Sequence, residues 1–291
     1  MSDTYDLIIR GGTVADGTGG ALREADIAIR GDRIAAVGAV AGRAAEEIDA
    51  RGRLVTPRFV DVHTHYDAQV TWSSHITPSS WNGVTTVLIG NCGVGFAPCL
   101  PERRQMLVEL MEGVEDIPEV VLTAGLPWNW QSFPEYLDVL AARRYDADVC
   151  TQVPHAALRV HVMGKRGADR EPATASDRAE MARLAAEGMA AGALGFSTSR
   201  TLAHKTLDGR HTPTLRAEES ELAEIAAALG RGWMQVISDF DDIDAEFALL
   251  RRLAEGSGRP MTISLLQREQ RPQAWRRILD HIHDANAAGC R

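Results

Sequence analysis

Hydrophobic positions in the first 56 residues form short runs that turn residues interrupt. Residues 25–30 alternate apolar and polar side chains with a period of two, which is the spacing of a strand with one buried face. Gly31 and Asp32 separate that run from the apolar segment 33–37, an arrangement typical of a β-hairpin with a two-residue turn. The pattern therefore predicts a β-rich module over residues 1–56.

After residue 56, apolar runs alternate with segments of helical periodicity. Strands are predicted at residues 58–63, 84–90, 148–153, 193–198, 233–238 and 261–267. Helices are predicted at residues 101–112, 176–190, 216–229, 243–254 and 272–287, with a further helix that begins at Ser132. Such alternation favours an α/β fold with a parallel sheet. A (β/α)8 barrel has eight such units, so residues 57–291 predict a TIM-like barrel that stops after about six.

A pair of histidines follows the first of these predicted strands. The apolar segment 59–62 runs directly into His63 and His65, and residues i and i+2 of a strand face the same side. The pair stands at the carboxyl end of its strand, where parallel barrels keep their active sites. Cys92 follows the next strand, flanked by glycines, and its thiolate would be a soft ligand for zinc. We therefore predict a metal site made of His63, His65 and Cys92.

Several segments together resemble the amidohydrolase superfamily and, within it, the N-acyl-D-amino-acid deacylase (D-aminoacylase) branch. They read DLIIRGGTVADGTG, ADIAIRGDRIAAVG, FVDVHTHYD, GVTTVLIGNCGVGFAP and AGALGFSTSR. The resemblance covers the whole chain and implies a (β/α)8 barrel joined to a small N-terminal β-sandwich. It also implies that zinc, as one or two ions, activates the water that hydrolyses the amide of an N-acyl-D-amino acid.

Matched to the family pattern, His63, His65 and Cys92 fall on metal-binding positions. The segment 195–198 falls on a loop at the substrate side of the fourth barrel strand, so the predicted substrate contacts are Ser197, Thr198 and Arg200. His155, which follows Pro154 near a predicted strand end, is a further candidate for substrate contact.

The sequence departs from the family pattern where the family places further metal-centre groups. Relatives carry a histidine at the ends of the fifth and sixth strands, whereas these strands end here in VISDF (236–240) and ISLLQ (263–267). The family's catalytic aspartate follows an eighth strand that the predicted elements do not include. Asp239 stands where a ligand is expected, so it is predicted as a substitute oxygen ligand or catalytic base.

Composition and charge restrict the partners that are expected. The 291 residues are 45% hydrophobic, and 31 Lys and Arg against 40 Asp and Glu give a net charge of −9, which disfavours a nucleic-acid partner. No apolar run approaches the ~18 residues of a membrane span. Four cysteines are too few for a disulfide framework, which favours a cytoplasmic protein with reduced thiols. The expected partner is a small-molecule substrate, and a homo-oligomer would be one way to cover exposed barrel edges.

Three functions remain open at this point. The first is a zinc-dependent hydrolase of N-acyl-D-amino acids, the second a truncated or degenerate relative without catalysis, and the third a cyclic-amide hydrolase similar to hydantoinase or dihydroorotase. The NCG and GFST segments favour the first. Because the two strand histidines and the eighth-strand carboxylate are absent, we expect the chain by itself to be a poor catalyst or inactive.

Overall fold

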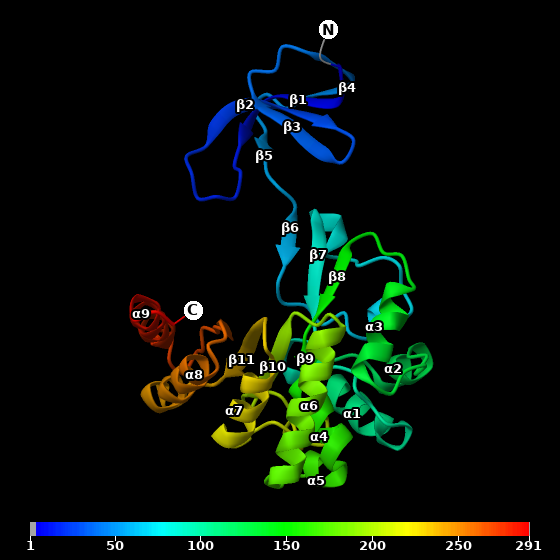
Figure 1. The fold of residues 1–291 in the computed structure, drawn as a ribbon, viewed down its shortest axis with the longest axis vertical. Helices are drawn as coiled ribbons and strands as arrows, with labels where there is room; N and C mark the ends of the chain where they lie inside the picture. The colour runs from blue at the N-terminus through cyan, green and yellow to red at the C-terminus, as the bar shows by residue number, and fades with distance from the viewer. Residues whose placement is uncertain (1–3, 291) are drawn as a thin grey trace. The chain divides into compact units, whose positions relative to one another are not determined.

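A computed structural model describes residues 4–290 of the protein. The chain divides into two compact units, one that ends at Phe59 and one that begins at Val60 (Figure 1). The division lies close to Pro57, after which the hydrophobic pattern changes from short alternating runs to strands interleaved with helices.

The first unit is a single five-stranded sheet in which β1 is central. Its strands are β1 (Thr4–Val14), β2 (Arg23–Arg30), β3 (Arg33–Gly38), β4 (Arg43–Asp49) and β5 (Leu54–Val55). Strands β2 and β3 are antiparallel, with Arg30 opposite Arg33, which confirms the predicted hairpin. The expected β-sandwich is not found, since the strands of residues 4–58 all belong to this one sheet. No second sheet covers its apolar side chains there, and Ile34 and Val37 stay 66% and 45% exposed.

Parallel strands in chain order form the framework of the second unit. They are β6 (Phe59–Asp61), β7 (Val84–Ile89), β8 (Asp148–Thr151), β9 (Val153–Pro154), β10 (Gly195–Arg200), β11 (Trp233–Ser238) and β12 (Met261–Ser264). One sheet has the order β6-β7-β8 and the other the order β9-β10-β11-β12. The pairs β7–β8, β9–β10, β10–β11 and β11–β12 are parallel. The segment 148–154 thus pairs with β7 at its start and with β10 at its end, and the predicted α/β class is confirmed.

Helices occupy the connections between these strands. They are α1 (Arg104–Glu115), α2 (Glu119–Gly125), α3 (Phe133–Ala141), α4 (His155–Met163), α5 (Lys165–Ala168), α6 (Ala175–Ala191), α7 (Glu219–Ala228), α8 (Ile243–Ser257) and α9 (Ala274–Ala287). Ser132 is the N-cap of α3, which confirms the helix predicted to begin there, and Glu135 completes a reciprocal pair with it. The connection from β6 to β7 contains only the 3-10 turns η1 (Gln69–Thr71) and η2 (Ser80–Asn82), so the first predicted βα unit lacks an α-helix.

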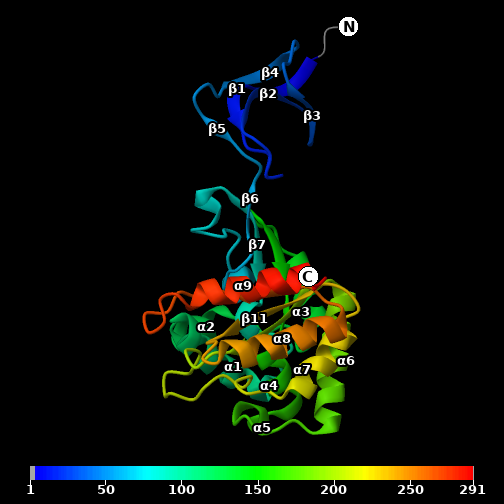
Figure 2. The same ribbon diagram turned by 90° about the vertical axis from the view of Figure 1, so that its left-hand side faces the viewer.

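The helices pack in a continuous layer against the strands. Helix α6 contacts α3, α4 and α7, while α8 contacts α7 and α9; Figure 2 shows α8 and α9 running side by side. The core between the layers includes the fully buried side chains of Phe96, Trp130, Leu158, Met181 and Phe196. Among the described residues, no helix combines the length and apolarity that a membrane crossing requires.

Candidate metal centre

Three predicted ligands meet beyond the carboxyl ends of β6 and β7. The nitrogen and sulfur donors that His63, His65 and Cys92 offer all lie within 4.8 Å of one another. The Nε2 atom of His63 is 3.1 Å from the sulfur of Cys92, and the two imidazole rings are 5.3 Å apart at their centroids. Within residues 4–290, this is the one group of three or more such side chains close enough to share an ion.

The turn that carries Cys92 is held in an uncommon backbone conformation. Gly90 and Gly93 have positive φ angles, and Cys92 itself adopts φ 56°, in the left-handed region that few residues other than glycine enter. A side chain at Gly90 would lie 2.3 Å from the carbonyl oxygen of Gln152. The glycines are therefore required both by the backbone angles and by the close approach of neighbouring strands.

Burial keeps the ligands of this group uncharged at neutral pH. Burial, together with the neighbouring imidazoles of His63 and His204, lowers the pKa of His65 to about 3. Burial also lowers the pKa of His63. The pKa of the Cys92 thiol is raised by burial and by the negative charges of Glu115 and Asp67. The group consists of two neutral imidazoles and a protonated thiol until a cation or other partner compensates the thiolate.

Two carboxyl groups for which the sequence predicts no role face His65. Glu115, the last residue of α1, places its Oε1 atom 3.4 Å from Nε2 of His65. The Oδ2 atom of Asp67 lies 4.0 Å from Nδ1 of His65, and both of these atoms are buried without a hydrogen-bond partner among the described residues. Burial raises the pKa of Asp67 to about 8 and that of Glu115 to about 7. Glu115 carries no motif, and only the fold brings it to the histidines.

Strands β11 and β12 contact the ligands through polar side chains. The side-chain oxygen of Gln235 accepts the backbone N–H of Cys92 at 2.7 Å, and its nitrogen donates to the hydroxyl of Ser264 at 3.0 Å. That hydroxyl lies 3.2 Å from Nδ1 of His63. The two strands on which the family pattern expects histidines thus contact the metal group by hydrogen bonds.

The predicted substrate contacts Ser197, Thr198 and His155 are buried and make internal hydrogen bonds. Their side chains are at most 1% exposed. The hydroxyl of Ser197 accepts the N–H of Gly93 at 2.9 Å and donates to the carbonyl of Gly90. Thr198 meets Nδ1 of His155 at 2.9 Å. Ser197 therefore supports the turn that carries Cys92. Thr198 and His155 belong to a separate buried network of polar side chains.

That network contains a buried ion pair. The Nε2 atom of His155 lies 2.7 Å from Oε1 of Glu221, and Arg159 donates to the same carboxylate at 2.6 Å. Burial opposes ionisation of Glu221, but the hydrogen bond from His155 and the charge of Arg159 lower the pKa of this carboxyl to about 2. Burial lowers the pKa of His155.

Arg200 and Asp239 lie apart from the three ligands. Arg200 donates to both oxygens of Glu246. Asp239 accepts hydrogen bonds from Thr201 and from the backbone N–H of Leu202, both at 2.7 Å. The structure therefore does not bring Asp239 into the ligand group, because the loop after β10 uses both of its carboxylate oxygens.

His204 lies on this same loop. Its Nδ1 atom is 2.9 Å from the hydroxyl of Ser199, the residue whose backbone packs against Gly93. The pKa of His204 is lowered to about 4, mainly by burial. The charge of Asp239 acts to raise this pKa, and His63 acts to lower it. His204 thus interacts electrostatically with His63 and His65.

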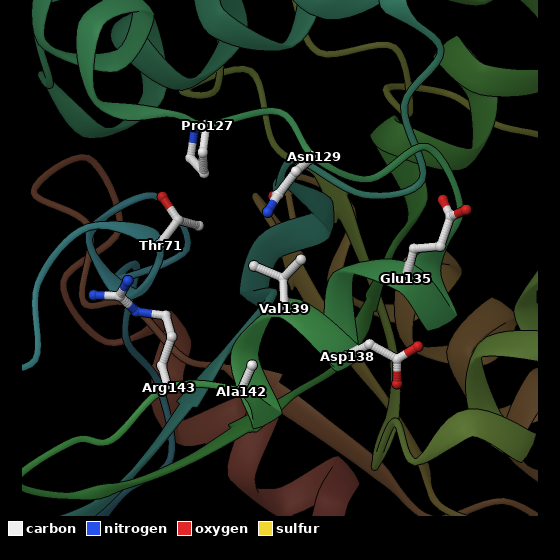
Figure 3. Close-up of a pocket in the computed structure, with 8 residues that line it drawn as sticks. All are labelled: Thr71, Pro127, Asn129, Glu135, Asp138, Val139, Ala142 and Arg143. Atoms are coloured by element: carbon white, nitrogen blue, oxygen red, sulfur yellow. The ribbon is translucent and has the colours of Figure 1, made fainter.

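Two larger cavities differ in their relation to the ligands. One of about 600 Å³ is lined mainly by apolar side chains of the strands and includes His63, Gln235 and Ser264 in its wall. Another of about 530 Å³ lies beside α3 (Figure 3). Its wall consists of Thr71, Pro127, Asn129, Glu135, Asp138, Val139, Ala142 and Arg143. Only the first cavity reaches the metal group.

Comparison with known proteins identifies the family. The Amidohydrolase family profile matches residues 46–289, which is most of the chain. The chain belongs to the amidohydrolase family. This membership confirms the resemblance that the His-x-His, NCG and GFST segments indicate.

Relatives of this amidohydrolase-family chain include proteins named D-aminoacylase. It is 35% identical over 229 residues to a D-aminoacylase of Alcaligenes xylosoxydans xylosoxydans, covering 78% of this chain and 43% of that protein. A crystal structure of D-aminoacylase superposes with a TM-score of 0.76 at 30% identity, over 97% of this chain and 56% of that one.

A third relative has been solved with a metal. It is the N-acyl-D-glutamate deacylase of Bordetella bronchiseptica in complex with zinc and a phosphonate inhibitor that mimics the tetrahedral intermediate. The TM-score is 0.74 and the identity 29%, over 99% of this chain and 57% of that one. The chain therefore spans about half the length of these relatives, and less than half of the curated D-aminoacylase.

Proposed function

We propose that this chain forms the metal-binding part of a hydrolase that cleaves the amide bond of N-acyl-D-amino acids. The observation that carries the proposal is the convergence of His63, His65 and Cys92 within 4.8 Å. Two relatives from Alcaligenes xylosoxydans xylosoxydans, named D-aminoacylase and N-acyl-D-glutamate deacylase and each 35% identical to this chain, support the choice of substrate class.

The donor set fits a zinc ion. Two imidazole nitrogens and one thiolate are ligands that zinc takes in catalytic sites, where three protein ligands leave a further position open. Zinc bonds are ~2.0–2.3 Å long, so the 3.1 Å between Nε2 of His63 and the sulfur of Cys92 is within reach of one ion. The donor atoms that lie farthest apart, at up to 4.8 Å, would move closer together when an ion binds. The buried Nδ1 of His65, which has no hydrogen-bond partner among the described residues, is consistent with a site that needs a further group.

When bound, zinc supplies Lewis-acid polarisation of the amide carbonyl and a lower pKa for water. The residues of the chain hold the ion, exclude bulk water on the side of the buried Cys92, and move protons. Glu115 is placed to hold the proton that passes from water to the leaving amine, since its carboxylate is 3.4 Å from His65. Asp239 was predicted for this role, but both of its oxygens already bind the 201–202 loop.

We propose zinc as the ion, a barrel of which these residues form about six units, and a cytoplasmic setting with reduced thiols. All four cysteines are free, which supports the last of these. We also propose that the partner of this chain is a small-molecule substrate and that the chain forms a homo-oligomer.

The test is an assay of the purified chain with added zinc. N-acetyl-D-amino acids, their L-enantiomers and a cyclic amide are offered in parallel, and release of free amine or ring opening is followed. We expect turnover of D-substrates alone, slower than the ~10 s⁻¹ of a typical enzyme, and lost in His63→Ala. Zinc binding with no turnover of any D-substrate would favour the non-catalytic alternative, and ring opening would favour the cyclic-amide alternative.

A further inference from the structure

A closed ring of hydrogen bonds joins two of the ligands through two other side chains. Starting from Cys92, the ring passes from its backbone N–H to Gln235 at 2.7 Å and on to Ser264 at 3.0 Å. It continues to Nδ1 of His63 at 3.2 Å and returns from Nε2 of His63 to the Cys92 sulfur at 3.1 Å. The members come from four segments that lie far apart in the sequence.

The chemistry of the groups fixes how Gln235 is oriented. A backbone N–H can only donate, so the oxygen of the Gln235 amide must face Cys92, and the amide NH₂ must face Ser264. The hydroxyl of Ser264 accepts that bond and also meets the imidazole of His63. Gln235 is only 4% exposed and Cys92 only 2%, so water cannot easily replace these bonds.

The ring determines which atom of His63 faces the thiol. With Nδ1 held at Ser264, the opposite nitrogen, Nε2, points to the sulfur of Cys92. The same ring holds the left-handed Cys92 residue through its backbone N–H. In metal sites generally, partners of this kind fix the orientation of ligands.

We propose that Gln235 and Ser264 are positioning residues of the metal centre, which hold Cys92 and His63 in the orientation that binds the ion. This inference rests on the proposed function, because it presupposes that these side chains bind a metal. Strand β11 thereby holds the backbone of Cys92, and strand β12 holds the imidazole of His63. Loss of such partners typically weakens metal affinity 10–100-fold.

The experiment measures metal binding rather than activity. Wild type, Gln235→Leu, Ser264→Ala and Ser264→Thr are titrated with zinc against a chromogenic chelator, and with cobalt to record the thiolate-to-metal absorption band. Thr262→Ala is the matched control, because Thr262 lies two residues from Ser264 on the same strand and no hydrogen bond links its side chain to the ring.

We expect zinc affinity to fall 10–100-fold in Gln235→Leu and Ser264→Ala, and the cobalt–thiolate band to weaken or shift in Gln235→Leu. Ser264→Thr keeps the hydroxyl, so its zinc affinity should stay within about threefold of wild type. The control Thr262→Ala should likewise bind zinc within about threefold of wild type. If Gln235→Leu does not fold, the two Ser264 variants decide the question. Wild-type affinity and an unchanged cobalt spectrum in Ser264→Ala would overturn the positioning role while leaving the metal centre in place. A wild-type chain that binds neither ion would overturn both.

Discussion

The hydroxyl of Ser197 accepts the backbone N–H of Gly93 at 2.9 Å. The same hydroxyl donates to the carbonyl of Gly90, so one side chain of β10 connects both ends of the turn that presents Cys92. Ser197 is fully buried. A residue that the family pattern places at the substrate side therefore supports the turn of a proposed metal ligand.

Ser197→Ala should destabilise the protein and weaken zinc binding together. The substitution leaves a buried N–H and a buried carbonyl unpaired, which costs about 1–3 kcal/mol, and it frees the Cys92 turn. The midpoint of urea unfolding and a zinc titration measure the two effects. Ser176→Ala, at an exposed position on α6, is the control. A raised KM with unchanged stability and zinc affinity would instead indicate substrate contact.

Alanine at two helical glycines should have opposite effects. At Gly113 in α1, a Cβ atom would lie 2.2 Å from the carbonyl oxygen of Lys205, so the loop that carries His204 must move, at a cost of about 1–3 kcal/mol. At Gly256 in α8, nothing lies within 4 Å, and alanine should stabilise by about 0.5–1 kcal/mol. Urea unfolding of both variants checks the pair, and equal effects of the same sign would contradict the described packing of this loop on α1.

Removing one partner of the buried ion pair Arg159–Glu221 should lower the free energy of unfolding strongly. Both side chains are 2% exposed, and Arg159→Met leaves an uncompensated carboxylate, which typically costs about 3–5 kcal/mol. The double variant Arg159→Met/Glu221→Met removes both charges and should lose less stability than the sum of the single changes. A double-mutant cycle by chemical denaturation measures the coupling; strict additivity would show that the two charges do not interact.

The stabilisation that Glu221 contributes should disappear in acid. Its pKa in the folded protein is about 2, against 4.5 for the free side chain. Above about pH 4.5 this contribution is fully present, and it is lost as the pH falls toward 2, because the unfolded chain binds the proton first. The difference in unfolding free energy between wild type and Glu221→Gln should therefore shrink over this range. A difference independent of pH between 5 and 2.5 would argue against an ionised Glu221.

Zinc should stabilise the folded chain, and a chelator should reverse the effect. An ion that binds only the folded state at 100 times its Kd adds about 2.7 kcal/mol, which appears as a higher Tm. Cys92→Ser and His65→Ala should lose most of this rise, whereas Cys290→Ser, at the end of the chain beyond α9, should retain it. Thermal unfolding with and without zinc gives the result, and an equal Tm rise in Cys92→Ser would place the ion elsewhere.

Local patterns in the sequence determined the elements and three of the residues at the site. The hairpin around Gly31, the cap at Ser132 and the long helix α6 depend on short-range geometry, which sequence spacing expresses directly. His63 and His65 stand two residues apart at a strand end, so a period of two already places them on one side.

Only the tertiary structure decided which other side chains surround these ligands. Gln235 is 143 positions from Cys92, and Ser264 is 201 positions from His63; neither lies in a motif, and their contacts arise because the strands meet in space. Glu115 at the end of α1 reaches His65 for the same reason. The sequence predicts Ser197 as a substrate contact, and only the structure shows that its buried hydroxyl bonds the backbone of Gly90 and Gly93. Spacing along a chain reports local geometry, whereas burial and pairing between distant segments depend on how the whole chain packs.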